Sequence, residues 1–173
     1  MKITDGGAGQ ITRLQTLDQA RARYAYERSI AARDELDTSR GEAERYCRLA
    51  EMLPSLIQAN GLGATLAFLA SKSAKEKDSG GEARGEKAPV RNLEKAEGRL
   101  FEDLAAWLTR AEWPSGPYCR KLQEEESSGR LVLLRRLTTN DAQTYRRATV
   151  ETLALASWLK RLSAALIEKK GKD

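Results

Sequence analysis

Residues 53–69 read LPSLIQANGLGATLAFL, and this stretch predicts two helices with a tight junction between them. Asn60 and Gly61 tolerate the left-handed backbone conformation that ends a helix, and Gly63 lets another backbone come close. Because Pro54 cannot donate a hydrogen bond into the preceding turn, the first helix is expected to bend or restart there. The short helix after the junction is apolar nearly all round, which predicts burial of Leu66, Phe68 and Leu69.

Apolar residues recur at helical spacing on both sides of this stretch. In addition to the short helix, they predict helices over residues 16–37, 41–57, 93–112, 131–137 and 140–169. Thr16 or Asp18 can cap the first of these helices, and Asn140 or Asp141 can cap the last. No alternating pattern typical of strands is found in the sequence. The fold class is therefore predicted to be all-α, a single compact bundle of about six or seven helices.

Polar stretches flank and interrupt this bundle. Residues 1–15 are rich in glycine and poor in apolar side chains, which predicts a flexible N-terminal tail. Residues 71–92 carry too few apolar groups to offset the entropy lost on ordering, and we expect one long flexible loop there. A linker between two helical halves is the alternative. With a C-terminal tail at residues 171–173, the 173-residue chain is predicted to form one helical domain over residues 16–170.

The composition excludes several classes of enzyme. The chain contains no histidine, so it holds neither a Ser-His-Asp triad, nor a Cys-His pair, nor a zinc site with histidine ligands. Cys47 and Cys119 are too few for a four-thiolate zinc site and are expected to be reduced thiols. We expect no cofactor and no metal. No secretory or membrane-spanning stretch is visible, which favours a cytoplasmic protein.

Glycine-rich loops and carboxylates give no catalytic motif. Residues 6–10 lack the Gly-Lys-Ser/Thr ending of a nucleotide P-loop. The glycines at 61 and 63 lack a third glycine and follow a predicted helix rather than a strand, which favours a helix junction. Two acidic pairs are expected on an exposed helix face, Glu94 with Glu97 and Glu102 with Asp103. Exposed pairs of this kind do not favour a metal-dependent nuclease.

Basic residues give the positive functional signal. The chain carries a net charge of +5, and residues 130–173 hold 10 basic and 4 acidic groups, so the excess lies in the C-terminal region. Three basic pairs occur there, at 135–136, 146–147 and 160–161. A spacing of 14 residues returns to within about 40° on a helix, so the second and third pairs are predicted to share one face.

A second set of basic residues lies in the first predicted helix, where Arg21 and Arg28 share a face close to Tyr24. Guanidinium groups suit phosphate because their fork is planar and always charged, and such rows can track a nucleic-acid backbone without reading bases. Pairing of these arginines with Glu27, with Glu151 or with the acidic middle of the chain, residues 93–129, is the alternative. The predicted phosphate contacts are Arg21, Arg28, Arg135, Arg136, Arg146, Arg147, Lys160 and Arg161.

Five segments of the chain together match the pattern of a known family. They are TLDQARARYAYE at residues 16–27, the junction stretch at 53–69, FEDLAAWL at 101–108, YRRATVETL at 145–153 and WLKR at 158–161. In this order and spacing they resemble the small helical subunit of the type III-B CRISPR effector complex. The resemblance covers about residues 16–70 and 93–168.

The resemblance implies an all-helical, non-catalytic protein that acts within a ribonucleoprotein. Copies of such a subunit stack along a guide RNA paired with a target RNA, beside backbone and large subunits that carry the catalytic activities. The implied partners are guide RNA, target RNA, those subunits and further copies of this chain. Base pairing would supply specificity, while protein contacts only backbone and shape. The residues proposed above as RNA contacts follow from local charge, not from the family pattern.

Three other interpretations remain open. A helical scaffold would bind other protein subunits without contacting RNA, and its arginines would serve acidic partners. A nuclease would need divalent metal. A helix-turn-helix regulator is least favoured, because no short pair of helices with a polar recognition helix is visible. We expect the aromatic side chains Tyr24, Tyr26 and Trp158 to belong to the core rather than to stack on bases.

Overall fold

The computed structural model describes residues 16–73, 93–110 and 129–168, with side chains from residue 133 onward in the last of these ranges. The described residues form helices and no strands, which confirms the predicted all-α class. The helices are α1 (Leu17–Glu35), α2 (Glu42–Asn60), α3 (Leu62–Lys72), α4 (Ala96–Thr109), α5 (Gly129–Thr139) and α6 (Ala142–Leu166). The predicted tails, Cys119 and most of the predicted polar loop lie outside the described residues.

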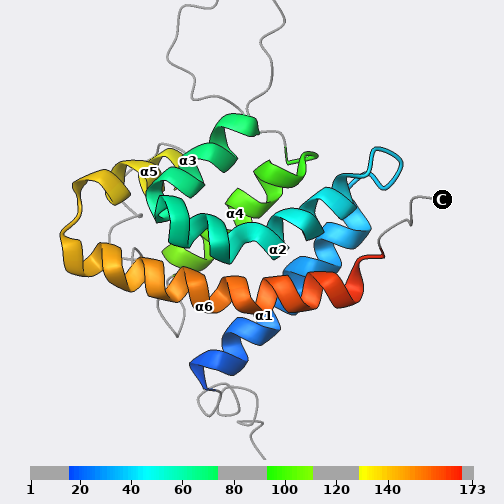
Figure 1. The fold of residues 1–173 in the computed structure, drawn as a ribbon, viewed down its shortest axis with the longest axis horizontal. Helices are drawn as coiled ribbons and strands as arrows, with labels where there is room; N and C mark the ends of the chain where they lie inside the picture. Colours follow the sequence, from blue (N-terminus) through cyan, green and yellow to red (C-terminus); the bar gives the residue numbers. More distant parts are fainter. Residues whose placement is uncertain (1–15, 74–92, 111–128, 169–173) are drawn as a thin grey trace, which may run out of the picture.

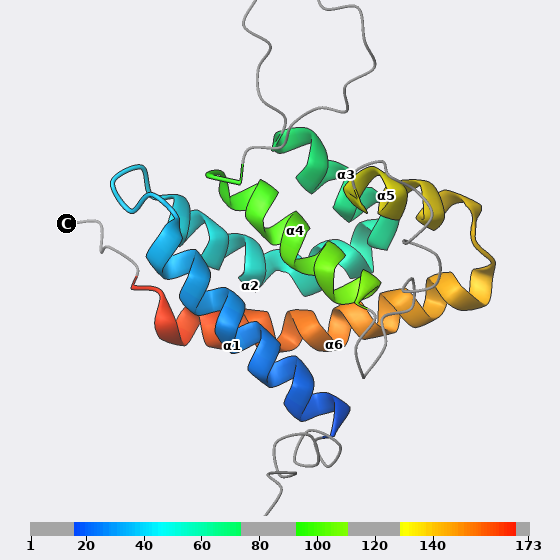
Figure 2. The ribbon, with the colours of Figure 1, turned by 180° about the vertical axis from the view of Figure 1, so that it is seen from behind.

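The longest helix, α6, supports the bundle from one side. Both α1 and α2 pack along it, α1 crossing it as Figure 2 shows. Helix α4 contacts all five of the other described helices, and α5 lies against α3 and α4 (Figure 1). Residues on the side of α6 that faces away from α1 and α2, among them Arg146, Val150 and Ser157, are exposed.

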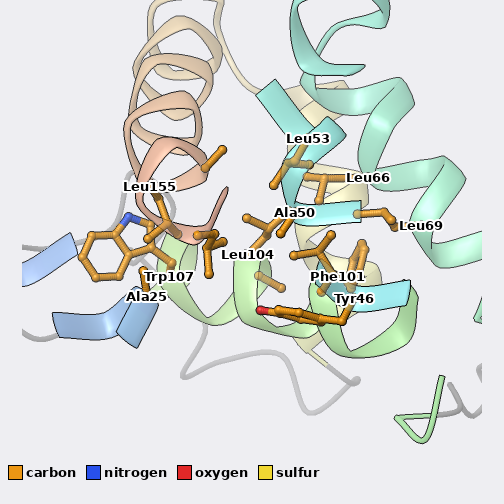
Figure 3. Packing of buried hydrophobic residues seen from close by; sticks show 14 of the residues in the cluster. Ala25, Tyr46, Ala50, Leu53, Leu66, Leu69, Phe101, Leu104, Trp107 and Leu155 are labelled. Carbon is orange, nitrogen blue, oxygen red and sulfur yellow. The ribbon is translucent and has the colours of Figure 1, made fainter. Parts of the chain in front are cut away.

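The core is built from the facing sides of α2, α3, α4 and α6. Leu53 of α2, Leu66 of α3, Leu104 of α4 and Leu155 of α6 are all fully buried (Figure 3). Helix α1 contributes small buried side chains instead, namely Ala20, Ala25, Ser29 and Ala32. Because small side chains allow a short interaxial distance, α1 can lie close against its neighbours.

The ends of the first and last helices carry the predicted kind of cap. Thr16 closes a capping box, because its hydroxyl accepts from the Gln19 amide at 3.2 Å and the Gln19 side chain accepts from the Thr16 amide at 2.9 Å. At the start of α6 the cap is Asp141, whose carboxylate accepts from the amides of Gln143 and Thr144, both at 2.9 Å. Of the two candidates predicted for each cap, Thr16 caps α1 and Asp141 caps α6.

The junction between α2 and α3 lies where the sequence predicts it. A single residue, Gly61, separates the two helices and has φ +82°, a conformation that side-chain-bearing residues rarely adopt. The group that comes close to Gly63 is a side chain rather than a backbone, since the Gly63 amide donates to the Tyr145 hydroxyl at 3.1 Å. The Gly63 amide, which has no carbonyl partner within the first turn of α3, thereby donates to a side chain of α6.

Two local expectations need correction. Of the two alternatives at Pro54, a restart is wrong, because α2 runs unbroken through the proline, with Leu53 and Ile57 buried on both sides of it. Phe68 is not buried but 42% exposed. It falls on the outer side of α3 because Leu66 and Leu69 occupy the side that faces the core.

Gly61→Ala is expected to lower the free energy of unfolding by about 1–3 kcal/mol, because the Cβ would strain a backbone held at φ +82°. Urea-induced unfolding followed by circular dichroism would measure this change.

Gly63→Ala is the matched control. Its Cβ would lie 3.6 Å from the Tyr145 hydroxyl, an ordinary contact, and the position is helical. We expect this variant to be neutral or more stable by up to about 1 kcal/mol. Equal losses in the two variants would contradict a specific requirement for glycine at position 61.

Candidate nucleic-acid interface

The outer side of α6 carries four exposed basic residues, Arg146, Arg147, Lys160 and Arg161, which we name the α6 basic face. The two pairs are separated by 14 residues and hence by about 21 Å along the helix axis. None of the four has an ion-pair partner within the described ranges. No carboxylate among these described residues therefore neutralises the four charges.

The surface between the two pairs is uncharged. Val150 is 66% exposed there, Ser157 is exposed and Ala154 is half-buried. The α6 basic face thus consists of two cationic ends and a neutral centre of small side chains. A rigid helix holds this spacing fixed, which suits contacts with two separated groups of phosphates.

Helix α5 places Arg135 and Arg136 close to the start of α6 in the chain. Arg135 is exposed and Arg136 is half-buried, and only Asn140 and Asp141 separate the two helices. The first of the three predicted basic pairs therefore lies on the helix that leads directly into the α6 basic face.

Arg21 lies inside the fold rather than on an open surface. Its side chain is 15% exposed, and its Nε and Nη2 atoms lie 3.2 and 2.6 Å from the two carboxylate oxygens of Glu151. The alternative noted in the sequence, pairing with Glu151, is therefore the arrangement found. Because α1 and α6 are joined by this bidentate contact, Arg21 connects the two helices.

Glu151 also binds groups at the end of α4. The indole Nε1 of Trp107 donates to it at 2.9 Å, and Nη2 of Arg110 lies 3.4 Å away. The Arg110 guanidinium carbon sits 3.5 Å from the centroid of the Trp107 ring. Burial alone would raise the pKa of Glu151, but the hydrogen bond and charge of Arg21, together with Trp107 and Arg110, hold that pKa below its usual value.

Arg28 lies beside a buried carboxylate. Its Nη1 is 4.0 Å from Oδ1 of Asp103, and its guanidinium carbon is 5.4 Å from the centroid of the Tyr24 ring. Asp103 is 2% exposed, accepts from the Tyr46 hydroxyl at 2.8 Å, and has Nε of Arg99 at 3.8 Å. Burial raises the pKa of Asp103 to about 7, although Tyr46 and the two arginines oppose the shift.

The expected exposure of the α4 carboxylates is wrong for two of them. Glu97 is 3% exposed and accepts from Nε and Nη2 of Arg45 at 2.9 and 2.5 Å, and Asp103 is buried as described above. Both are covered because α4 contacts every other described helix. The two carboxylates are held by different partners on α2, Arg45 and Tyr46. The described residues include no group of three or more acidic or cysteine side chains placed to hold a metal ion.

The aromatic residues divide between core and surface. Tyr24 is half-buried, stacks obliquely on Trp107 at 4.9 Å and donates to the Asp103 carbonyl at 2.7 Å. Trp158 is half-buried and donates to Asp18 at 2.9 Å. Tyr26, expected in the core, is 50% exposed because it lies on the outer side of α1.

The eight predicted phosphate contacts are therefore not one surface. Four form the α6 basic face and two lie on α5, whereas Arg21 contacts the half-buried Glu151 and Arg28 the buried Asp103, both between helices. The spacing of residues along one helix could not show that Arg21 lies against Glu151, because the two residues are 130 positions apart in the chain. No helix among the described residues is long and apolar enough to cross a membrane.

The raised pKa of Asp103 predicts a defined pH dependence of stability. The folded protein keeps a proton on Asp103 up to about pH 7, whereas an unfolded aspartate releases it near pH 4. The contribution of Asp103 to the free energy of unfolding therefore falls as the pH rises from about 4 to 7. Asp103→Asn cannot titrate and still accepts from Tyr46. As the pH rises from about 4 to 7, the free energy of unfolding of Asp103→Asn should therefore increase relative to that of the wild type. Urea unfolding at several pH values measures this difference.

Asp37→Asn is the control for this measurement. Hydrogen bonds from Ser39 lower the pKa of exposed Asp37, so its contribution is lost only below about pH 4. The difference between this variant and the wild type should stay constant between pH 5 and 7. A constant difference for Asp103→Asn as well would contradict a titrating carboxylate at that position.

Comparison with known proteins identifies the family. A family model described as CRISPR-associated protein (Cas_Cmr5) matches residues 17–166, from the first residue of α1 to the last residue of α6. The fold is similar to the crystal structure of a CRISPR-associated Cmr5 family protein from Thermus thermophilus. That match has 27% sequence identity and a TM-score of 0.54, and it covers 89% of this chain and 100% of that chain. The resemblance expected from the five sequence segments is confirmed, and the chain belongs to the Cmr5 family, the small subunits of the type III-B CRISPR (Cmr) complex.

Proposed function

We propose that the α6 basic face contacts the sugar–phosphate backbone of guide RNA paired with target RNA, assisted by Arg135 and Arg136 of α5. The observation that carries this proposal is the exposure of both basic pairs on one side of α6 without carboxylate partners among the described residues. Backbone contacts fix position without reading sequence, and base pairing then supplies specificity. Such a contact suits a subunit that stacks, in several copies, along one ribonucleoprotein.

Arg21 and Arg28 are left out of the proposed RNA surface. Transfer of Arg21 to a phosphate would break its bidentate contact with Glu151 and leave that carboxylate partly buried with fewer partners. Arg28 is similarly engaged by Asp103 and the Tyr24 ring. We assign both arginines a structural role and expect the RNA affinity to depend on α5 and α6.

We propose a non-catalytic role for the chain within the complex. The sequence has no histidine, and the buried carboxylates Glu97 and Asp103 are occupied by Arg45 and Tyr46. A single helical domain over residues 16–170 and a cytoplasmic location, beside the transcripts that the complex would bind, belong to the same proposal. A nuclease would instead cleave RNA as purified protein, in a reaction that EDTA abolishes.

Reversal of charge on the α6 basic face tests the RNA contact. Arg146→Glu with Arg147→Glu should weaken binding of unrelated RNA duplexes to similar extents, because backbone contacts do not depend on sequence. The slope of log affinity against log salt concentration should fall by about 1–2 units, since up to two phosphate contacts are lost. Fluorescence anisotropy with labelled RNA at several salt concentrations measures both quantities.

Arg23→Glu with Arg33→Glu is the matched control, because it changes the net charge by the same amount at two exposed positions of α1. This variant should keep the salt slope of the wild type. Equal losses in both double variants would mean that total charge, not the α6 basic face, drives binding. Unchanged RNA affinity of the α6 variant, with loss of contacts to other subunits, would favour the scaffold interpretation.

A further inference from the structure

The charge of the α6 basic face is concentrated at its two ends. The two basic pairs lie about 21 Å apart along the helix axis. Residues 148–159, between the pairs, include one charged residue, Glu151, and its carboxylate is held by Arg21 of α1. The side chains of Val150, Ala154 and Ser157 form the surface of the centre. The face therefore consists of two separate cationic ends and not of one continuous basic row.

A carboxylate of α1 lies beside the neutral centre. Asp18 accepts from the indole Nε1 of Trp158 at 2.9 Å, and its side chain is 63% exposed. Nη1 of Arg21 lies 3.8 Å from this carboxylate, while another nitrogen of the same guanidinium binds Glu151. Because like charges repel, Asp18 makes the middle of α6 less favourable for a phosphate than either end.

A single strand running parallel to α6 does not match this distribution. One strand of a duplex carries a phosphate about every 3.4 Å of axis, so about six phosphates would lie along the 21 Å between the pairs. Those in the middle would face Val150 and Ala154 and lose hydration without meeting a cation. A strand that continued past the ends would approach the exposed carboxylates of Asp141 and Glu168, which precede and follow the two pairs in the chain.

Two strands on opposite sides of a groove match it better. The minor groove of A-form RNA is wide and shallow, and its floor displays base edges and 2′-hydroxyls between two rows of phosphates. A helix that crosses this groove places each cationic end at a different strand and its neutral centre over the floor. Small side chains there permit a close approach. The Ser157 hydroxyl donates to the Leu153 carbonyl at 3.1 Å and can still accept from a 2′-hydroxyl.

We propose that α6 lies across the minor groove of the guide–target duplex and bridges its two strands. Arg146 and Arg147 contact the phosphates of one strand, and Lys160 and Arg161 contact those of the other. This inference rests on the proposed RNA contact and adds the form of its ligand, an A-form RNA duplex rather than a single strand. The full contact then forms only where target RNA has paired with the guide.

Crosslinking within the assembled complex tests the bridging. Gln143 and Ala164 are exposed on α6 close to the two basic pairs, and each would be replaced separately by azidophenylalanine. The complex would be loaded with guide and target RNA that carry different labels and then irradiated. We expect the main adduct of one position to contain guide RNA and that of the other to contain target RNA. Without target RNA, only one of the two positions should give an RNA adduct.

The other outcomes separate this proposal from the RNA contact on which it rests. Main adducts of both positions with the same strand would overturn the bridging and leave the RNA contact in place. A lack of RNA adducts from both positions would overturn the two proposals together.

RNA affinity of the isolated chain gives a second test. Fluorescence anisotropy should show an RNA duplex bound about tenfold more tightly than either of its strands, because a single strand meets one cationic end at a time. Reversal of charge at either end, Arg146→Glu with Arg147→Glu or Lys160→Glu with Arg161→Glu, should reduce this preference to similar extents. Arg23→Glu with Arg33→Glu, the control on α1, should keep it. Equal affinity for duplex and single strands would overturn the bridging.

A cation added at the centre distinguishes the two ways in which RNA can lie on α6. If α6 crosses a groove, no phosphate lies opposite Ala154, and Ala154→Lys should leave the slope of log affinity against log salt concentration unchanged. If one strand follows α6, the added charge meets a phosphate and the slope should rise by about 1 unit. Such a rise would overturn the bridging while supporting the RNA contact.

Discussion

The contact between Glu151 and its partners Arg21, Trp107 and Arg110 joins three parts of the fold. It ties α6 to α1 through two charge-assisted hydrogen bonds and to α4 through the indole of Trp107. Because this carboxylate is partly buried, it depends on all three partners for the hydrogen bonds that water would otherwise supply. Removal of one partner would leave the half-buried Glu151 carboxylate with fewer hydrogen bonds at the point where α1, α4 and α6 meet.

This constraint explains why one helix can serve two purposes. The inner side of α6 holds the bundle through Glu151, Leu155 and Leu159, while its outer side keeps four basic residues exposed. Tyr145 binds the start of α3 through the Gly63 amide, directly before Arg146 and Arg147 in the chain. The basic residues are therefore carried by a helix that is fixed along its length.

The helices and the α2–α3 junction could be predicted because their signals are local. Helical spacing, the capping residues and Gly61 each act within a few positions of the chain. The environment of the charged residues could not be predicted in the same way. Arg21 pairs with a residue 130 positions away, and Tyr46 with Asp103 57 positions away. A charged residue on a helix has the same local pattern whether it meets water or a distant partner.

The exposure of Phe68 and the burial of the α4 carboxylates could likewise not be predicted from the local sequence pattern. The short helix α3 is apolar nearly all round, so the pattern does not indicate which side faces the core, and Phe68 falls on the outer side. On α4, Glu97 and Asp103 are buried because five other helices surround the helix. Only knowledge of the packing could place Arg45 and Tyr46 opposite them. The shared side of the four residues of the α6 basic face was predictable because it follows from their spacing along one helix, which is a local signal.

Arginine footprinting of the assembled complex tests the central claim most directly. Phenylglyoxal would be applied to the complex and to the isolated chain, and modified residues would be mapped by mass spectrometry. The account predicts that Arg146, Arg147 and Arg161 are protected in the complex and become reactive once ribonuclease removes the RNA. Arg23 and Arg33, which are exposed on α1, should have the same reactivity before and after the ribonuclease treatment. Reactive arginines on α6 in the intact complex, or protection there that survives ribonuclease, would contradict the assignment of this face to RNA.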